Sequence, residues 1–379
     1  MTDTSFFDHF DTHFSSLSDP RIDRKKQHSL RDILLLTILG VICGAESWTD
    51  IELFGESRQD HLKGVLQLPN GIPSHDTLGR VFSLLNPKQL EASFLSWINS
   101  LVTLSDGELI AIDGKTLRRS HDRKSGVGAI HMVSAWASEN AVVLGQVKTD
   151  EKSNEISAIP QLLSKLNLQG CTVSIDAMGC QKAIAQQIRE QEGHYLLALK
   201  GNQSTLHDDV QLFIESELKK KDSDAVFDYA ESSNKGHGRI ERRQAWVTDQ
   251  IEWLRKRHPD WVDLRSIGMI ESERHVDDKT SIEHRFYIGS GPANAAELLE
   301  GTRRHWAIEN ELHWVLDVSF NEDQCRVRVG HAAENLAVIR HIAINLLKQE
   351  PSKLSMRAKR RKAGWDHKFL CKVLTGNKF

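Results

Sequence analysis

The chain has 379 residues, 39% of them hydrophobic and 27% charged, and a net charge of only −3. These values are ordinary for a soluble globular protein and suit two or three domains. The longest uncharged apolar run, 33–45, is shorter than the about 20 residues that a bilayer requires, so we expect no membrane contact.

Cysteine usage and the start of the chain indicate a reducing compartment. The opening segment MTDTSFFDHFD is acidic and lacks the basic and apolar regions of a signal peptide. Five cysteines are scattered without a CxxC pair, so neither a disulfide framework nor a zinc site is indicated. We therefore expect a cytoplasmic protein.

Residues 1–103 are predicted to form a helical domain. The apolar run from Ser29 to Ala45 favours a buried helix with a serine cap, and a second helix is expected to begin near Ser47. Two short helices, at about 74–82 and 90–101, are typical of a helix-turn-helix DNA reader. A plain helical packing domain fits these residues equally well.

From residue 104 the pattern becomes that of an α/β domain, 104–349. Three adjacent strands are followed by helix, strand, helix and strand, which is the order of a ribonuclease-H-like domain. The expected strands are 109–114, 130–137, 141–147, 171–176 and 195–199, and the expected helices are 156–166, 181–190, 295–318 and 331–349. Alternating segments between about 201 and 293 predict a β-rich insertion.

Two aspartates end two of these strands, Asp113 in AIDG and Asp176 in SIDA. Strand ends at one edge of a sheet can bring two carboxylates together, and a divalent cation would relieve their repulsion. Oxygen ligands of this kind suit Mg²⁺ or Mn²⁺. Each aspartate alone could equally be an ordinary cap or turn former.

A third carboxylate is expected from the helix that contains IENELHWVLD. Glu309 shares a helical face with Trp306 and His313, whereas Glu311 lies about 200° around the helix. Glu309 is therefore better placed than Glu311 to face a polar site. A surface ion pair with a nearby arginine is the alternative role of Glu309.

Basic residues gather at the C-terminal end, 350–379, which we interpret as a tail. Ten lysines and arginines lie between Lys348 and Phe379, against Glu350 and Asp366. Such a run is typical of a phosphate-contacting tail, although a solvated terminus has the same composition.

Several segments, in this order along the chain, resemble the H-repeat-associated, Rhs-linked insertion-sequence transposases, which are DDE (aspartate-aspartate-glutamate) transposases. The most specific are AIDGK at 111–115, KSNEI at 152–156, IDAMGCQ at 175–181, ALKGNQ at 198–203, HGRIE at 237–241 and the stretch 306–317. The resemblance implies a ribonuclease-H-like catalytic core with a β insertion before the last carboxylate. It also implies that Asp113, Asp176 and Glu309 form the catalytic, metal-holding triad.

One departure concerns the residues around the glutamate. Some related families carry a lysine seven positions after it, where this chain has Leu316. We therefore expect DNA contacts from other residues. The candidates are Lys115, Arg118, Lys200, His237, Arg239, Arg303, Arg304, Asn310, His313, Lys359, Arg360, Arg361 and Lys362.

The resemblance implies a DNA transposase. Two Mg²⁺ or Mn²⁺ ions are expected to support cleavage at the element's ends and joining to target DNA. The expected partners are double-stranded DNA, with terminal inverted repeats and target, and a second copy of the chain or a larger synaptic complex, in a bacterial cytoplasm. A catalytically decayed DNA-binding relic and a nuclease that hydrolyses without joining are the alternatives.

Overall fold

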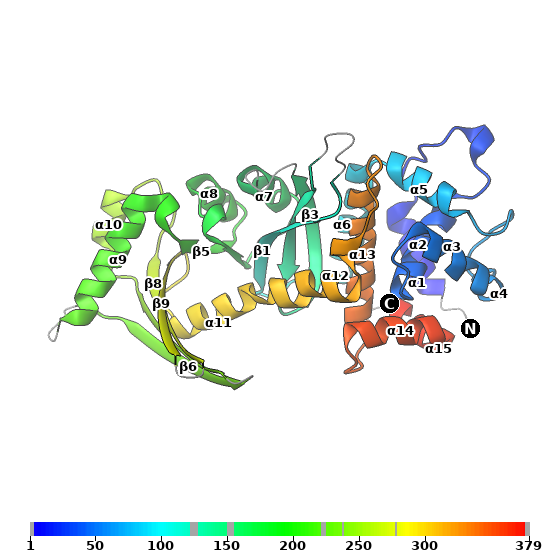
Figure 1. Cartoon of the computed structure of the whole chain (residues 1–379). Helices are drawn as coiled ribbons and strands as arrows, with labels where there is room; N and C mark the ends of the chain where they lie inside the picture. The colour runs from blue at the N-terminus through cyan, green and yellow to red at the C-terminus, as the bar shows by residue number, and fades with distance from the viewer. Residues whose placement is uncertain are drawn as a thin grey trace.

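The computed structural model describes residues 4–121, 128–149, 155–220, 225–236, 239–276 and 279–375. Figure 1 shows a helical part that contains both ends of the chain, a central sheet with helices on both faces, and a long β extension at the far end. In the part of the chain so described, no helix is both long and apolar enough to cross a membrane.

The N-terminal region is helical, as predicted. Its helices are α1 Thr4–Phe14, α2 Leu30–Ile42, α3 Trp48–Ser57, α4 Gln59–Leu62, α5 His75–Leu84 and α6 Pro87–Leu101. The side chains of Ser29, Ser47, Ser74 and Asn86 accept backbone N–H groups and so cap α2, α3, α5 and α6. The DNA-reading role of α5 and α6 stays a prediction.

The central sheet is mixed. Its first five strands are β1 Leu109–Thr116, β2 His131–Ala137, β3 Val142–Thr149, β4 Thr172–Ile175 and β5 His194–Leu199. β1, β4 and β5 run parallel to one another, and β2 and β3 pair antiparallel on the other side of β1. Helices α7 Glu155–Leu163 and α8 Lys182–Glu190 cover one face, and α11 Ala295–His305 covers the other (Figure 1).

The insertion extends this sheet, because β9 pairs with β5 and gives the strand order β3-β2-β1-β4-β5-β9-β8-β7-β6. Its elements are α9 Ser204–Lys219, β6 Asp228–Gly236, β7 Arg239–Thr248, α10 Glu252–Arg257, β8 Ser266–Val276 and β9 Lys279–Gly289. The sequence analysis did not separate α9 and α10 from the β-rich segment. The outer half of β9 is exposed and that of β8 is mostly half-buried, so neither carries a buried apolar face.

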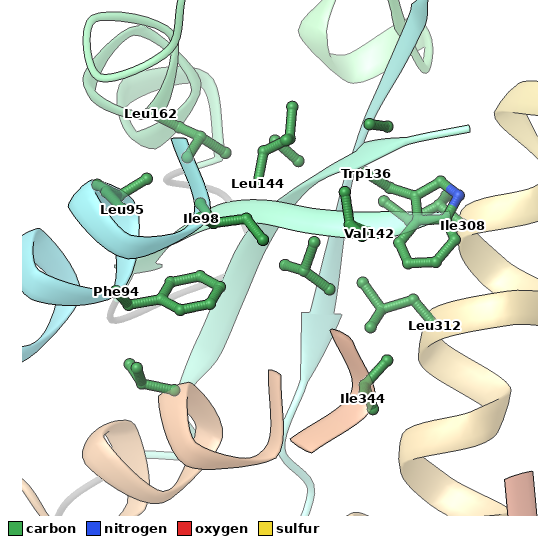
Figure 2. Close-up of a cluster of buried hydrophobic side chains, with 14 of the residues drawn as sticks. Phe94, Leu95, Ile98, Trp136, Val142, Leu144, Leu162, Ile308, Leu312 and Ile344 are labelled. Atoms are coloured by element: carbon green, nitrogen blue, oxygen red, sulfur yellow. The ribbon is translucent and has the colours of Figure 1, made fainter. Parts of the chain in front are cut away.

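The helix predicted over 295–318 is interrupted. After α11 the chain forms a π-helical turn, η5 Ile308–His313, and then α12 Trp314–Ser319. Ile308 and Leu312 of η5 are fully buried and lie beside Trp136 of the sheet (Figure 2). These two apolar residues hold η5 against β2, and the polar residues between them are thereby held in place as well.

The chain continues through η6 Glu322–Gln324 and α13 Ala332–Gln349. The segment after α13 was expected to be a tail, but it is folded. Residues 356–375 form α14 Met356–Trp365 and α15 His367–Thr375. Lys359 is buried and donates to the carbonyl of Leu347 at 3.0 Å, with its Nζ 3.3 Å from Glu350. The expectation that Lys359 contacts phosphate is corrected because its ammonium group is buried among protein acceptors.

Arg360 is buried in the same way. Its guanidinium donates to the carbonyls of Val41, Ala45 and Ser319, and it lies 4.1 Å from the centre of the Phe320 ring. Arg360 therefore joins α14 to the end of α2 and to the end of α12, and it is not available to DNA. The neighbouring Arg361 and Lys362 are exposed, so their phosphate contacts stay a prediction.

Candidate active site

Two parallel strands place Asp113 and Asp176 next to each other. The register of β1 against β4 pairs Ile112 with Ile175, and each aspartate is the residue that follows. Both side chains line one cavity of about 250 Å³, together with Lys200. Two carboxylates therefore meet where the pairing of β1 with β4 ends; Asp176 directly follows β4, whereas β1 continues for three residues beyond Asp113 and does not end there as predicted.

Asp176 is held by the backbone that follows it. Its Oδ1 accepts the N–H groups of Met178 at 3.0 Å and Gly179 at 3.3 Å, so it caps the short helix η3 Ala177–Gly179. Oδ2 makes no hydrogen bond within the described ranges. The carboxylate is thus oriented through one oxygen and leaves the other for a ligand.

The turn η5 brings Glu309 and His313 to Asp113. Nδ1 of His313 lies 3.0 Å from Oε2 of Glu309 and 3.5 Å from Oδ2 of Asp113. Donor atoms of these three residues all lie within 4.8 Å of one another, the group among the described residues that could hold a metal ion. π-Helical turns are rare and occur frequently at functional sites.

The charges of this site favour a cation. The pKa of Asp113 is raised to about 6, chiefly by burial and also by the nearby charge of Asp176, although His313 opposes the shift. The hydrogen bond from His313 lowers the pKa of Glu309. Carboxylates this close to one another repel, and a divalent ion with oxygen and nitrogen ligands would neutralise them.

Two buried residues near Asp113, His131 and Glu155, were not predicted from the sequence. Nε2 of His131 lies 2.5 Å from Oε1 of Glu155, and both side chains are almost fully buried. Gly114 lies directly against this pair, and a Cβ at that position would clash with both side chains. The only available signal was the position of Glu155 in the segment KSNEI.

Lys115 is not available to DNA, which corrects the expected role. Only 9% of its side chain is exposed, and its ammonium lies 2.7 Å from Asp317, 3.1 Å from Glu322 and 3.4 Å from Asp323. Lys115 and Asp113 are two residues apart on β1 and so face the same side of the sheet. Two contacts therefore join this side of β1 to the segment 313–317: Asp113 with His313, and Lys115 with Asp317.

The other expected DNA-contacting residues divide into exposed and engaged groups. Lys200 and Arg303 are exposed, and Lys200 lines the cavity of the two aspartates. Arg304 is engaged in ion pairs with Glu139 at 2.6 Å and Glu300 at 2.9 Å.

Of three further residues predicted to contact DNA, one lies next to Glu309 and two have no described side chain. Asn310 is exposed and donates to the carbonyl of Trp306. His237 lies outside the described residues, and the side chain of Arg239 is not described either. For both, a contact with DNA stays a prediction.

Comparison with known proteins identifies a family and several relatives that are named as transposases. The family model for the transposase DDE domain matches residues 104–346, and the model for the segment associated with that domain matches 12–98. The H repeat-associated putative transposase YhhI of Escherichia coli K12 is 44% identical over 96% of this chain and 97% of its own length. A putative transposase YncI of Escherichia coli O157:H7 is 42% identical over 96% of this chain and 93% of its own length.

Among solved structures, a piggyBac transposase synaptic complex with hairpin DNA matches the whole of this chain and 83% of the other. The sequence identity is 10% and the TM-score is 0.44, a likeness too low to support an argument.

The raised pKa of Asp113 predicts a pH-dependent gain of stability in Asp113→Asn. Because the folded-state pKa is about 6, against 3.8 ordinarily, ionisation of Asp113 destabilises the folded protein above pH 6 and hardly at all near pH 4. With 27% of the side chain exposed, we expect about 2 kcal/mol of added stability at pH 8. Urea unfolding at both pH values measures this difference.

Glu309→Gln is the matched control in the same cluster. Its pKa is lowered, so its ionised form stabilises the fold at pH 8 and its removal should lower stability there. A gain for Asp113→Asn that is equal at pH 4 and pH 8 would contradict the electrostatic account.

A second prediction concerns Lys115, which holds α12 to β1. Lys115→Met should weaken Mn²⁺ binding by about tenfold or more, because residues that orient metal ligands commonly have effects of this size. Asp317→Asn should have a smaller effect, since Lys115 keeps Glu322 and Asp323. Titration of Mn²⁺, with the unbound ion followed by its EPR signal, gives the affinity.

The control for this variant is Lys359→Met, which removes a comparably buried lysine from an ion pair with Glu350. It should lower the unfolding temperature and leave Mn²⁺ affinity unchanged. Equal losses of affinity in the two variants would show that Lys115 acts only through general stability.

Proposed function

This chain belongs to the DDE-domain transposases, and from that premise we propose that it cuts the ends of an insertion-sequence element and joins them to target DNA. The observation that carries the proposal is that Asp113 lies beside Asp176 and is also grouped with Glu309 and His313. Two of these carboxylates follow paired positions of β1 and β4, and Glu309 reaches the same place from η5. We assign strands β1–β5, in the order β3-β2-β1-β4-β5, to a ribonuclease-H-like core.

Carboxylate oxygens suit Mg²⁺ or Mn²⁺, and Asp113, Asp176 and Glu309 would hold two such ions. When bound, such ions supply Lewis-acid chemistry that activates an oxygen nucleophile and stabilises the leaving oxygen of an in-line displacement. Asp113 must be ionised to act as a ligand. Its pKa of about 6 leaves it mostly ionised at neutral pH.

The protein's own groups orient these carboxylates. The backbone of η3 fixes Asp176 through Oδ1, and His313 donates to Glu309 and faces Asp113. Buried residues Ile308 and Leu312 hold η5 on the sheet, so Glu309 keeps its place when the phosphate arrives. Preorganised carboxylates need no rearrangement during the reaction.

The first step hydrolyses a phosphodiester bond at the element's end and leaves a free 3′-hydroxyl and a 5′-phosphate. In the joining step that 3′-hydroxyl displaces a 3′-oxygen of the target strand, so one phosphodiester bond forms as another breaks and no nucleotide cofactor is needed. The reaction requires the cut 3′-hydroxyl to remain in the site and to attack target DNA. It also requires two element ends to be held together, so we propose that two or more copies of the chain assemble on double-stranded DNA with terminal inverted repeats. The transposase names of the relatives support this proposal.

The test of the third carboxylate uses three matched substitutions on one helix. Glu309→Gln should abolish cleavage of a DNA that carries the element's own ends. Glu311→Gln should retain most of it, because Glu311 is similarly exposed but pairs with Lys348 at 2.7 Å. Asp317→Asn should reduce cleavage partially by releasing Lys115. A denaturing gel with Mg²⁺ resolves cut and joined strands.

Asp113→Asn provides the complementary control. It should abolish both cleavage and joining while DNA binding in EDTA stays near the wild-type level, since the change is almost isosteric. Full cutting by Glu309→Gln together with an inactive Glu311→Gln variant would contradict the assignment of the triad. Cutting without joining by the wild-type protein would identify a hydrolytic nuclease.

A further inference from the structure

Two loops beside the candidate active site carry four arginines. Residues 117–121 contribute Arg118 and Arg119, and residues 325–331 contribute Arg326 and Arg328. The loops are joined by a hydrogen bond from Nε of Arg328 to the carbonyl of Arg119 at 2.8 Å. Only Arg118 was among the residues expected to contact DNA.

Both loops are direct continuations of the elements that hold the carboxylates. The first follows β1 and begins two residues after Lys115. The second follows η6, whose Asp323 lies 3.4 Å from Lys115 and 3.2 Å from Arg118. Figure 1 shows the segment between α12 and α13 rising beside the end of β1 towards α5.

The second loop is also fixed to the helical domain. The N–H of His331 donates to the carbonyl of Ser83 in α5 at 3.0 Å. Gly330 has a φ of +54°, and a Cβ there would clash with the same carbonyl, so this approach requires glycine. The first loop is held by Ser120, whose Oγ accepts the N–H of Ile130 at 2.8 Å. Both loops are therefore held in place, with Arg118 and Arg326 exposed and Arg119 and Arg328 half-buried.

These four arginines are poorly neutralised compared with those of the β insertion. Within the described part of the chain, Asp323 is the carboxylate that pairs with any of them, and it also serves Lys115. By contrast, the four arginines of the insertion sheet whose side chains are described all pair with glutamates. They are Arg242 with Glu231, Arg243 and Arg274 with Glu241, and Arg285 with Glu283.

We propose that Arg118, Arg119, Arg326 and Arg328 form the surface that binds the phosphates of duplex DNA next to the catalytic carboxylates. Guanidinium groups bind phosphate oxygens through paired, charge-assisted hydrogen bonds. A positively charged surface that joins the catalytic sheet to α5 would hold the duplex in a fixed position relative to Asp113. This inference rests on the proposed function for its partner, and it assigns the place where that partner binds.

The experiment is DNA binding without metal, so that cleavage does not enter the measurement. The test variant is Arg119→Gln/Arg326→Gln, and the matched control is Arg242→Gln/Arg274→Gln, which removes the same charge from paired arginines. The probe is a fluorescent duplex of about 30 base pairs, with binding followed by anisotropy in EDTA at salt concentrations from about 50 to 200 mM.

We expect the test variant to lower the slope of log affinity against log salt by about 1.8, because each lost phosphate contact on duplex DNA contributes about 0.9. The control should keep the wild-type slope. Equal unfolding temperatures exclude loss of folding, and Arg118→Gln alone gives a second variant with half the expected change. An unchanged slope in the test variant, or the same change in the control, would overturn the proposal.

The outcome is independent of catalysis. If the wild-type protein cuts DNA with Mg²⁺ but the test variant keeps the full slope, the arginine surface is wrong and the proposed function stands. If the slope falls but the wild-type protein cuts nothing, the surface binds DNA and the proposed catalytic function is wrong.

Discussion

The ion pair between the largely buried Lys115 and the half-buried Asp317 is the interaction on which the geometry of the site depends. Transfer of an ammonium and its partners out of water costs several kcal/mol, and such pairs contribute little net stability. They can, however, fix the register between elements, because an unpaired charge in the same place would be strongly destabilising. Here one lysine on β1 holds α12 and η6 through three carboxylates.

The same network reaches further into the fold. Glu322 also pairs with Arg340 of α13 at 3.2 Å, and both side chains are almost fully buried. Asn345 of α13 in turn bonds both backbone groups of Val143, on the edge strand β3, at 2.8 and 2.9 Å. A shift of α12 along β1 would therefore break contacts in α13 and at the sheet edge. His313 and Glu309, about one and two turns before Asp317, are held by this arrangement.

The sequence predicted the features that depend on local pattern. Apolar runs that lead to an aspartate pointed to Asp113 and Asp176, which lie at neighbouring positions of β1 and β4. Helical spacing separated Glu309, which lies near Asp113, from Glu311, which pairs with Lys348. The π-helical turn was not predictable in this way, because it alters the spacing that the argument assumed. The predictions of DNA contacts failed for lysines and arginines whose side chains are buried among protein acceptors.

Lys115, Lys359 and Arg360 show why. A basic residue has the same signature in sequence whether it meets phosphate or a buried carbonyl, since its partners are distant along the chain. Arg360 contacts Val41 and Ala45, more than 300 positions away. The run 357–362 alternates between the core and the solvent because α14 packs one face against α2 and α12, which its composition does not reveal.

The most direct test of the account is the location of a metal ion in the folded protein. Crystals soaked in Mn²⁺ can be examined by anomalous scattering, which identifies manganese independently of the protein. The account predicts a peak between Asp113 and Glu309 and a further contact with Asp176, with no equal peak elsewhere. Manganese bound at other carboxylates, with these three left without it, would contradict the assignment of the catalytic site.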